Sequence, residues 1–145
     1  MSFTLSRKRA EEAISRYATA ESINIIIGNA EGTYGLRQFY RNPHLSPVLL
    51  NLQSIETALR RIVKGLQSDG YTLRNFLDDT TQQAKEMDAL RRICVEEKHS
   101  SYLYSNRYRN EAENPWTQIS SFLDSSVTQL GALLDKAEAA RSFSN

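Results

Sequence analysis

The sequence predicts an all-α protein, an up-and-down bundle of four to five helices in one domain that spans residues 1–145. Three observations support this class. Apolar residues recur every three to four positions, which is the period of a helix with one buried side. The β-branched run at residues 23–27 has no second run with which it could pair as a strand. A chain of 145 residues can bury a core without disulfide bonds.

The clearest element is a central helix over residues 46–70. Its apolar residues alternate in spacings of four and three: Val48, Leu52, Ile55, Leu59, Ile62 and Leu66. Ser46 is the expected N-cap because its hydroxyl can accept a hydrogen bond from a free backbone amide, and Pro47 suits the first helical position. Gly70 is expected to end the helix in the left-handed conformation. We therefore expect the core to lie along this helix.

A first helix is predicted from about Ser6 to residues 25–28. Its expected apolar side consists of Ala10, Ile14, Tyr17 and Ala18. The glycines, asparagine and proline that follow are typical of a loop. We therefore predict one long loop near residues 28–45, about three times the usual length. Loops of this length often carry function.

Two more helices are predicted in the C-terminal half. A helical period runs from Leu73 to about Asn110, and the short link at Gly70 makes this helix antiparallel to the central one. Within it, residues 78–83 are expected to form a solvated face. The last helix is expected to have Asn114 as its N-cap and Pro115 as its first residue. The C-terminal tail, residues 142–145, is expected to fray.

The overall charge of the chain is close to zero and does not favour any class of partner. The chain has 18 Lys and Arg against 17 Asp and Glu, so binding to nucleic acid would depend on local clusters of charge. Its one cysteine, Cys94, excludes an intramolecular disulfide and is expected to be a buried apolar side chain. The apolar run at residues 23–27 is too short to span a bilayer. A cytoplasmic protein with no membrane partner is therefore predicted.

Two segments without acidic residues combine arginine with tyrosine, and they span residues 34–44 and 98–109. Cations attract phosphates and aromatic rings stack on bases, which is how single-stranded nucleic acids are bound. Tyrosine and arginine also dominate protein interfaces. A third possibility is that the rings pack on the bundle and the arginines only solvate its rim. The candidate binding residues are Tyr34, Arg37, Tyr40, Arg41, Tyr102, Tyr104, Arg107, Tyr108 and Arg109.

Arg92 and His99 are the candidate catalytic residues. They are separated by six residues and fit an Arg-x(4–6)-His pattern. This pattern resembles the active site of HEPN-domain ribonucleases, which are all-helical proteins of about this size. The resemblance implies that both side chains act on the scissile phosphate without a metal, usually across a dimer. The sequence departs from the pattern at Ile93, where a polar residue usually follows the arginine, and the alternative is a solvent-facing histidine near a helix end.

Neither a metal nor a cofactor is expected. Glu96 and His99 have the Glu-x-x-His spacing of di-iron bundles, which need two such motifs, and His44 has no glutamate three residues before it. Cys94 and the two histidines are too few and wrongly spaced to form a zinc site. No glycine-rich phosphate loop follows a predicted strand.

These observations leave three functions open. The first is a non-enzymatic protein–protein interaction module, such as an adaptor, inhibitor or small regulatory subunit, whose partner is another protein. The alternatives are binding of RNA or DNA through the two arginine- and tyrosine-rich segments, and a metal-independent ribonuclease. A homodimer fits all three, because the apolar stripe of the last helix includes Phe122 and Leu133 and is broader than one seam needs.

Overall fold

A computed structural model describes the backbone of residues 2–34, 45–104 and 115–144, and the side chains of residues 15–33, 45–97 and 115–139. This part of the chain forms four helices and contains no strand. Helix α1 spans Ser2–Tyr34, α3 spans Ser46–Leu66, α4 spans Leu73–Tyr104 and α5 spans Pro115–Ser144. The predicted all-α class is confirmed.

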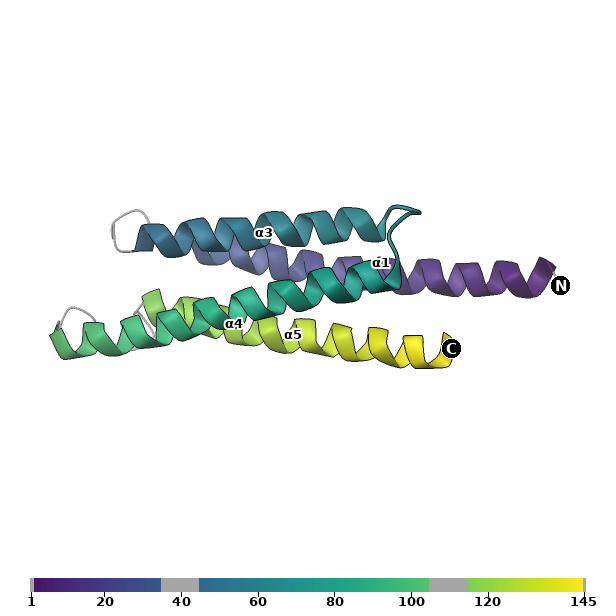
Figure 1. Ribbon diagram of the computed structural model, residues 1–145. Coiled ribbons are helices and arrows are strands. Elements are labelled where there is room, and N and C mark those ends of the chain that lie inside the picture. Colours follow the sequence, from purple (N-terminus) through teal and green to yellow (C-terminus); the bar gives the residue numbers. More distant parts are fainter. Residues whose placement is uncertain (1, 35–44, 105–114, 145) are drawn as a thin grey trace.

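The four helices lie along a common direction and reverse that direction at each connection (Figure 1). The main contacts join each helix to two others: α1 packs on α3, α3 on α4, α4 on α5, and α5 on α1. The contact between α4 and α5 is the most extensive of the four, and the contact between α1 and α5 is the smallest. The described residues therefore form a helical bundle in which one seam is more open than the others.

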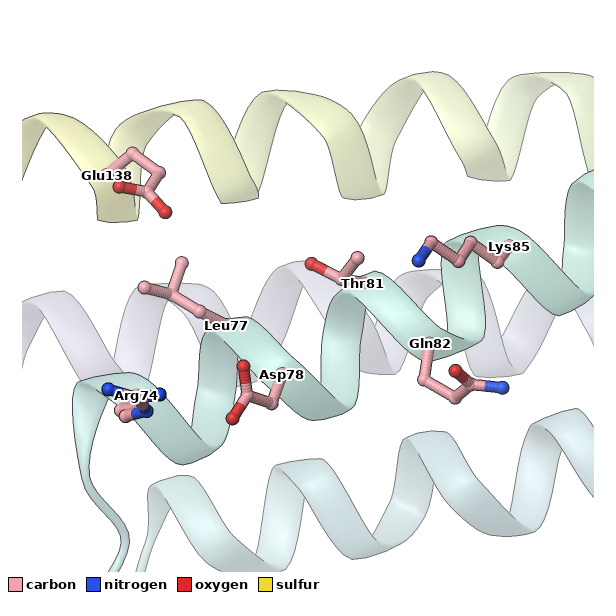
Figure 2. A pocket seen from close by; sticks show the side chains of 7 residues that line it. All are labelled: Arg74, Leu77, Asp78, Thr81, Gln82, Lys85 and Glu138. Carbon is pink, nitrogen blue, oxygen red and sulfur yellow. The ribbon is translucent and has the colours of Figure 1, made fainter.

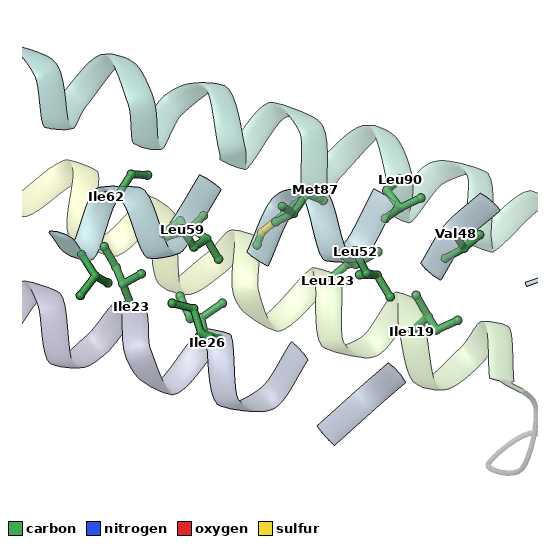
Figure 3. Close-up of a cluster of buried hydrophobic side chains, with 14 of the residues drawn as sticks. Ile23, Ile26, Val48, Leu52, Leu59, Ile62, Met87, Leu90, Ile119 and Leu123 are labelled. Carbon is green, nitrogen blue, oxygen red and sulfur yellow. The ribbon is translucent and has the colours of Figure 1, made fainter. Parts of the chain in front are cut away.

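All four helices contribute to one apolar core (Figure 3). The six apolar residues predicted to form the buried stripe of the central helix are all buried in α3. Side chains from the other three helices pack around them, including Ile23, Ile26, Met87, Leu90, Ile119 and Leu123. Burial of this apolar surface is the main force that holds the helices together.

The ends of α3 differ from the prediction. The N-cap is Leu45 and makes no side-chain capping bond, so Ser46 is the first helical residue and does not act as the cap. Leu45 is fully buried, and its packing fixes the start of the helix one residue earlier. The helix ends at Leu66, its last buried residue, and Gly70 does not adopt the predicted left-handed conformation.

The turn between α3 and α4 is tied to three helices. The Arg16 guanidinium of α1 donates hydrogen bonds to the backbone carbonyls of Ser68, at 3.1 Å, and Tyr71. The Tyr71 ring lies directly over Gly65 of α3, and its hydroxyl donates to Asp79 of α4 at 2.7 Å. These contacts fix the position of the turn.

Helix α1 is longer than predicted, because residues 28–34 continue the helix and do not belong to a loop. A helical glycine costs about 1 kcal/mol relative to alanine, and Gly28 and Gly32 face away from the core. Burial of Ile27 and Ala30 on the opposite side offsets this cost. The rest of the predicted loop, residues 35–44, lies outside the described residues.

The predicted apolar side of α1 is also wrong for the residues that can be checked. Tyr17 and Ala18 are exposed, and the helix packs on the core through Ala20, Ile23, Ile26, Ile27 and Ala30. The side chains of Ala10 and Ile14 lie outside the described set. The predicted side consists of residues from the N-terminal turns of α1, whereas the residues that pack on the core begin at Ala20.

Helix α4 begins at Leu73 as predicted, and the Thr72 hydroxyl accepts a hydrogen bond from the Asn75 amide at 3.1 Å. The predicted solvated face at residues 78–83 is partly wrong, because Thr80 and Gln83 are buried. Their apolar stems lie on the side of α4 that carries Phe76, Leu77 and Met87, so the helical phase takes them into the core.

Helix α5 begins at Pro115 as predicted, whereas the predicted cap Asn114 lies outside the described residues. The helix includes residues 142–144, and the fraying of the tail stays a prediction. None of the described helices is both long and apolar enough to cross a membrane.

Candidate functional site

The two arginine- and tyrosine-rich segments join helix ends that lie together at one end of the bundle. Helix α1 ends at Tyr34 and α4 ends at Tyr104, and these ends lie near the starts of α3 and α5 (Figure 1). No acidic residue occurs in the first turn of α3 or of α5. The binding candidates whose residues lie outside the described set are Arg37, Tyr40, Arg41, Arg107, Tyr108 and Arg109. The side chains of Tyr34, Tyr102 and Tyr104 also lie outside the described set.

Arg92 lies on an exposed side of α4 and forms an ion pair with Asp88 at 3.0 Å. Asp88 also pairs with Arg91 at 2.8 Å, and the hydrogen bond from Arg91 lowers the pKa of the Asp88 carboxyl. The backbone of His99 lies seven residues further along the same helix, about 10 Å along the axis. Its side chain lies outside the described set, so the proposed catalytic pairing stays a prediction.

One feature that sequence reasoning missed is a groove between α1 and α5. We call it the α1–α5 groove. Its volume is about 410 Å³, and it is lined by Gly28, Asn29, Gly32, Thr33, Gln118, Phe122, Ser125 and Ser126. The groove follows the seam at which two neighbouring helices contact each other least. It therefore lies where α1 and α5 are packed less closely than the other neighbouring helices.

Two glycines keep this groove open. A Cβ atom built on Gly28 or Gly32 would meet nothing within 4 Å, so the space above both backbones is free. On the opposite wall, Phe122 is half-buried and Ser126 is buried. The wall residues are small or polar except for this one ring, and small residues let another backbone approach closely.

The side of α1 that borders the groove continues toward the N-terminus and carries two exposed apolar residues. Tyr17 is 67% exposed and Ile25 is 61% exposed, and Glu21 lies between them on the same side of the helix. Gly28 is the next residue on this side, because spacings of three and four follow one side of a helix. We call the surface formed by Tyr17, Glu21, Ile25 and Gly28 the α1 outer face. Side chains this large and apolar on one side of a helix mark a candidate interaction surface.

The residues that line the groove are uncharged, and the charges on the neighbouring parts of its two helices are of one sign. Residues 17–34 of α1 and 115–135 of α5 include no Lys or Arg, and they carry the exposed carboxylates Glu21, Glu31, Asp124 and Asp135. Glu31 pairs with Arg60 of α3, which lies to the side of the groove. A partner that covers this surface would therefore meet acidic and neutral groups.

A second hollow lies on the opposite side of α5, at its contact with α4. Its volume is about 340 Å³, and Figure 2 shows charged and polar side chains along it. Arg74, Asp78 and Lys85 come from α4, and Glu138 comes from α5. Opposite charges alternate here on flexible exposed side chains, which is typical of a solvated helix surface.

The described residues show no metal or nucleophile site. No group of three or more histidine, cysteine or acidic side chains in this part of the chain lies close enough to hold a metal ion. Cys94 is buried, and burial raises the pKa of its thiol to about 12. The reactive thiolate is therefore almost absent at neutral pH.

Comparisons with known proteins add no family. Neither protein families, nor curated proteins, nor solved structures gave a match to this chain. The function must therefore be inferred from the geometry of the surface.

The sequence did contain a signal for the missed groove. Gly28 and Gly32 are four residues apart, which places both on one side of a helix. Glycine is also typical of loops, so the local sequence predicts a loop at these two positions and no groove. Once the helix extends to Tyr34, the two positions become one side of a groove.

Proposed function

We propose that this chain is a non-enzymatic helical protein–protein interaction module. Its binding surface is the α1 outer face together with the α1–α5 groove. The observation that carries this proposal is the continuity of the two: exposed Tyr17 and Ile25 lead directly to glycines that leave the groove open. An adaptor, inhibitor or small regulatory subunit in the cytoplasm would use such a surface.

The shape of the surface favours a helix as the bound element. An amphipathic helix binds in a groove through apolar residues spaced three and four apart. Helices α1 and α5 lie along a common direction (Figure 1), and both line the groove, so a helix bound parallel to them would contact both walls. Ile25 and the half-buried Phe122 are the apolar anchors, and Gly28 and Gly32 permit close approach.

The charges near the groove define the partner further. Because residues 17–34 of α1 and 115–135 of α5 carry four exposed carboxylates and no Lys or Arg, a helix with cations beside its apolar strip is favoured over an acidic one. The contribution of each surface charge is small, so these charges select among partners more than they add affinity.

Site-specific photo-cross-linking in the native host tests the proposal. A photoreactive phenylalanine analogue replaces Asn29 in the groove, and the matched control replaces Asn75, which is exposed at the start of α4. We expect a discrete protein adduct from position 29 and none from position 75. Ile25→Lys in the same chain should remove that adduct. No adduct from position 29, or equal adducts from both positions, would contradict the proposal.

A second candidate function is binding of single-stranded nucleic acid, and one observation favours it. The helix ends that flank both arginine- and tyrosine-rich segments lie at the same end of the bundle. Cations from two segments near each other attract a phosphate backbone more strongly than either does alone. The relevant probe is a fluorescent single-stranded RNA titrated at several salt concentrations.

The matched variants for this test are two pairs of arginines. Arg107→Gln with Arg109→Gln should weaken binding and flatten its salt dependence, whereas Arg61→Gln with Arg74→Gln, at exposed positions of α3 and α4, should leave both unchanged. Binding that is insensitive to salt and to the first pair would exclude this candidate.

A further inference from the structure

We propose that the helix bound by this surface is the N-terminal half of α1 from a second copy of the chain. The two α1 helices would pair antiparallel, so that each copy fills the α1–α5 groove of the other. This inference rests on the proposed function, because it names the partner of the same surface. Two independent observations support it.

The first observation is that α1 extends beyond the rest of the bundle. Arg16 contacts the α3–α4 turn, so the residues before it lie past the end of α3. In Figure 1 the N-terminal end of α1 also lies beyond the C-terminal end of α5. Among the described helices, none lies beside the N-terminal end of α1 (Figure 1), and an isolated helix of this length is marginal in water.

The second observation is the order of residue sizes along one side of α1. Spacings of three and four place Ala10, Ile14, Tyr17, Ile25, Gly28 and Gly32 on one line of the helix, with Glu21 at its centre. Ala10 and Ile14 lie in the projecting half, and both glycines of the line lie in the half that borders the groove.

Antiparallel pairing centred on Glu21 matches these two halves. It places Ile14 of one copy opposite Gly28 of the other, and Tyr17 opposite Ile25. Because the pairing has two-fold symmetry, each match occurs twice, as in an isologous interface. This pairing brings the projecting half of one copy to the open space beside Gly28 and Gly32 of the other.

Analytical ultracentrifugation of the full chain over a wide range of concentrations provides the first test. We expect a reversible dimer in the parent chain. Ile25→Lys should weaken dimerisation by about tenfold or more, because it removes an anchor from both copies. Leu50→Lys, a matched change of an exposed apolar residue on α3, should leave dimerisation unchanged. Circular dichroism of each variant checks that the helices are retained.

Cysteine cross-linking tests the register. Single variants Tyr17→Cys and Ile25→Cys are mixed and oxidised with copper phenanthroline, and the parent chain, in which Cys94 is buried, gives the background. We expect the mixed pair to cross-link much faster than either variant alone. Faster cross-linking of either single variant with itself would contradict the antiparallel register. Glu21→Gln should strengthen the dimer severalfold, because the two Glu21 side chains meet near the axis.

The outcomes separate this inference from the proposed function. A chain that stays monomeric at every concentration overturns the inference. If position 29 then still cross-links to a different protein, the proposed function stands with another partner. If position 29 cross-links to nothing, both fail.

Discussion

Helix α5 packs against two neighbours in different ways. On its α4 side, Ile119, Leu123 and Leu130 are fully buried in the most extensive helix contact of the bundle. On its α1 side, the contact is the smallest of the four, and glycines across the seam leave a groove of about 410 Å³. One helix therefore has a closed seam and an open one.

This difference separates stability from function. Closely packed apolar side chains stabilise the fold, and any loss of volume among them leaves a cavity. An open seam lined by small residues contributes less to folding and leaves a surface for a partner. We therefore expect substitutions on the two sides of α5 to change different measurements.

The largest effect is expected on the closed side. Leu123→Ala removes a fully buried side chain and should lower the free energy of unfolding by about 3 kcal/mol. Phe122→Ala, on the neighbouring half-buried residue of the groove, should cost clearly less although it removes more atoms. Urea unfolding followed by circular dichroism measures both. Equal losses would show that the groove is as closely packed as the core.

Two helical glycines extend the comparison. A Cβ on Gly65 would lie 2.5 Å from Cδ2 of the Tyr71 ring, so Gly65→Ala must displace the ring that fixes the α3–α4 turn. We expect a loss of about 2 kcal/mol, which is typical of overpacking. The free energy of unfolding from urea titration is the measurement. An unchanged value would mean that Tyr71 moves aside without cost.

Substitution of Gly32, in the α1–α5 groove, should change the stability in the opposite direction to Gly65→Ala. Gly32→Ala adds a methyl group where nothing lies within 4 Å and raises helix propensity. We expect the protein to be more stable by about 0.5 to 1 kcal/mol in thermal unfolding. A loss of stability would indicate that the groove is filled in the free chain.

The smallest effect is expected from the Tyr71 hydroxyl. Tyr71→Phe removes its bond to Asp79, which is exposed, and should cost about 0.5 kcal/mol at neutral pH. Burial, and then the bond to Asp79, raise the pKa of Tyr71 above its ordinary value of 10.0. A raised pKa in the folded state means that this stability is complete below pH 10 and is lost as pH rises further. The parent chain should therefore lose more stability than the variant between pH 10 and pH 11, as measured by urea unfolding.

Local sequence patterns predicted much of the fold. The apolar stripe of α3 and the starts of α4 and α5 follow from spacings of three and four and from residues such as Thr72 and Pro115. These features depend on residues close together in the chain, whose preferences are readable without knowing their neighbours in space.

Predictions failed where a distant element decided the outcome. Gly28 and Gly32 are loop residues by local preference, and burial of Ile27 and Ala30 against other helices makes them helical. Thr80 and Gln83 are polar, and the phase of α4 buries them. The α1–α5 groove also depends on a distant element, because two helices form it. The sequence predicts a loop at residues 28–34, and without a helix there the α1 wall of the groove is missing.

The sequence by itself determined that this chain is helical and which side of α3 is buried, because helical periodicity is a local property. Only the tertiary structure decided how far α1 extends, how Arg16 and Tyr71 fix the α3–α4 turn, and that the groove lies between α1 and α5. Those outcomes depend on packing between residues that are far apart in the chain, and the strength of such packing depends on the shapes that meet in space.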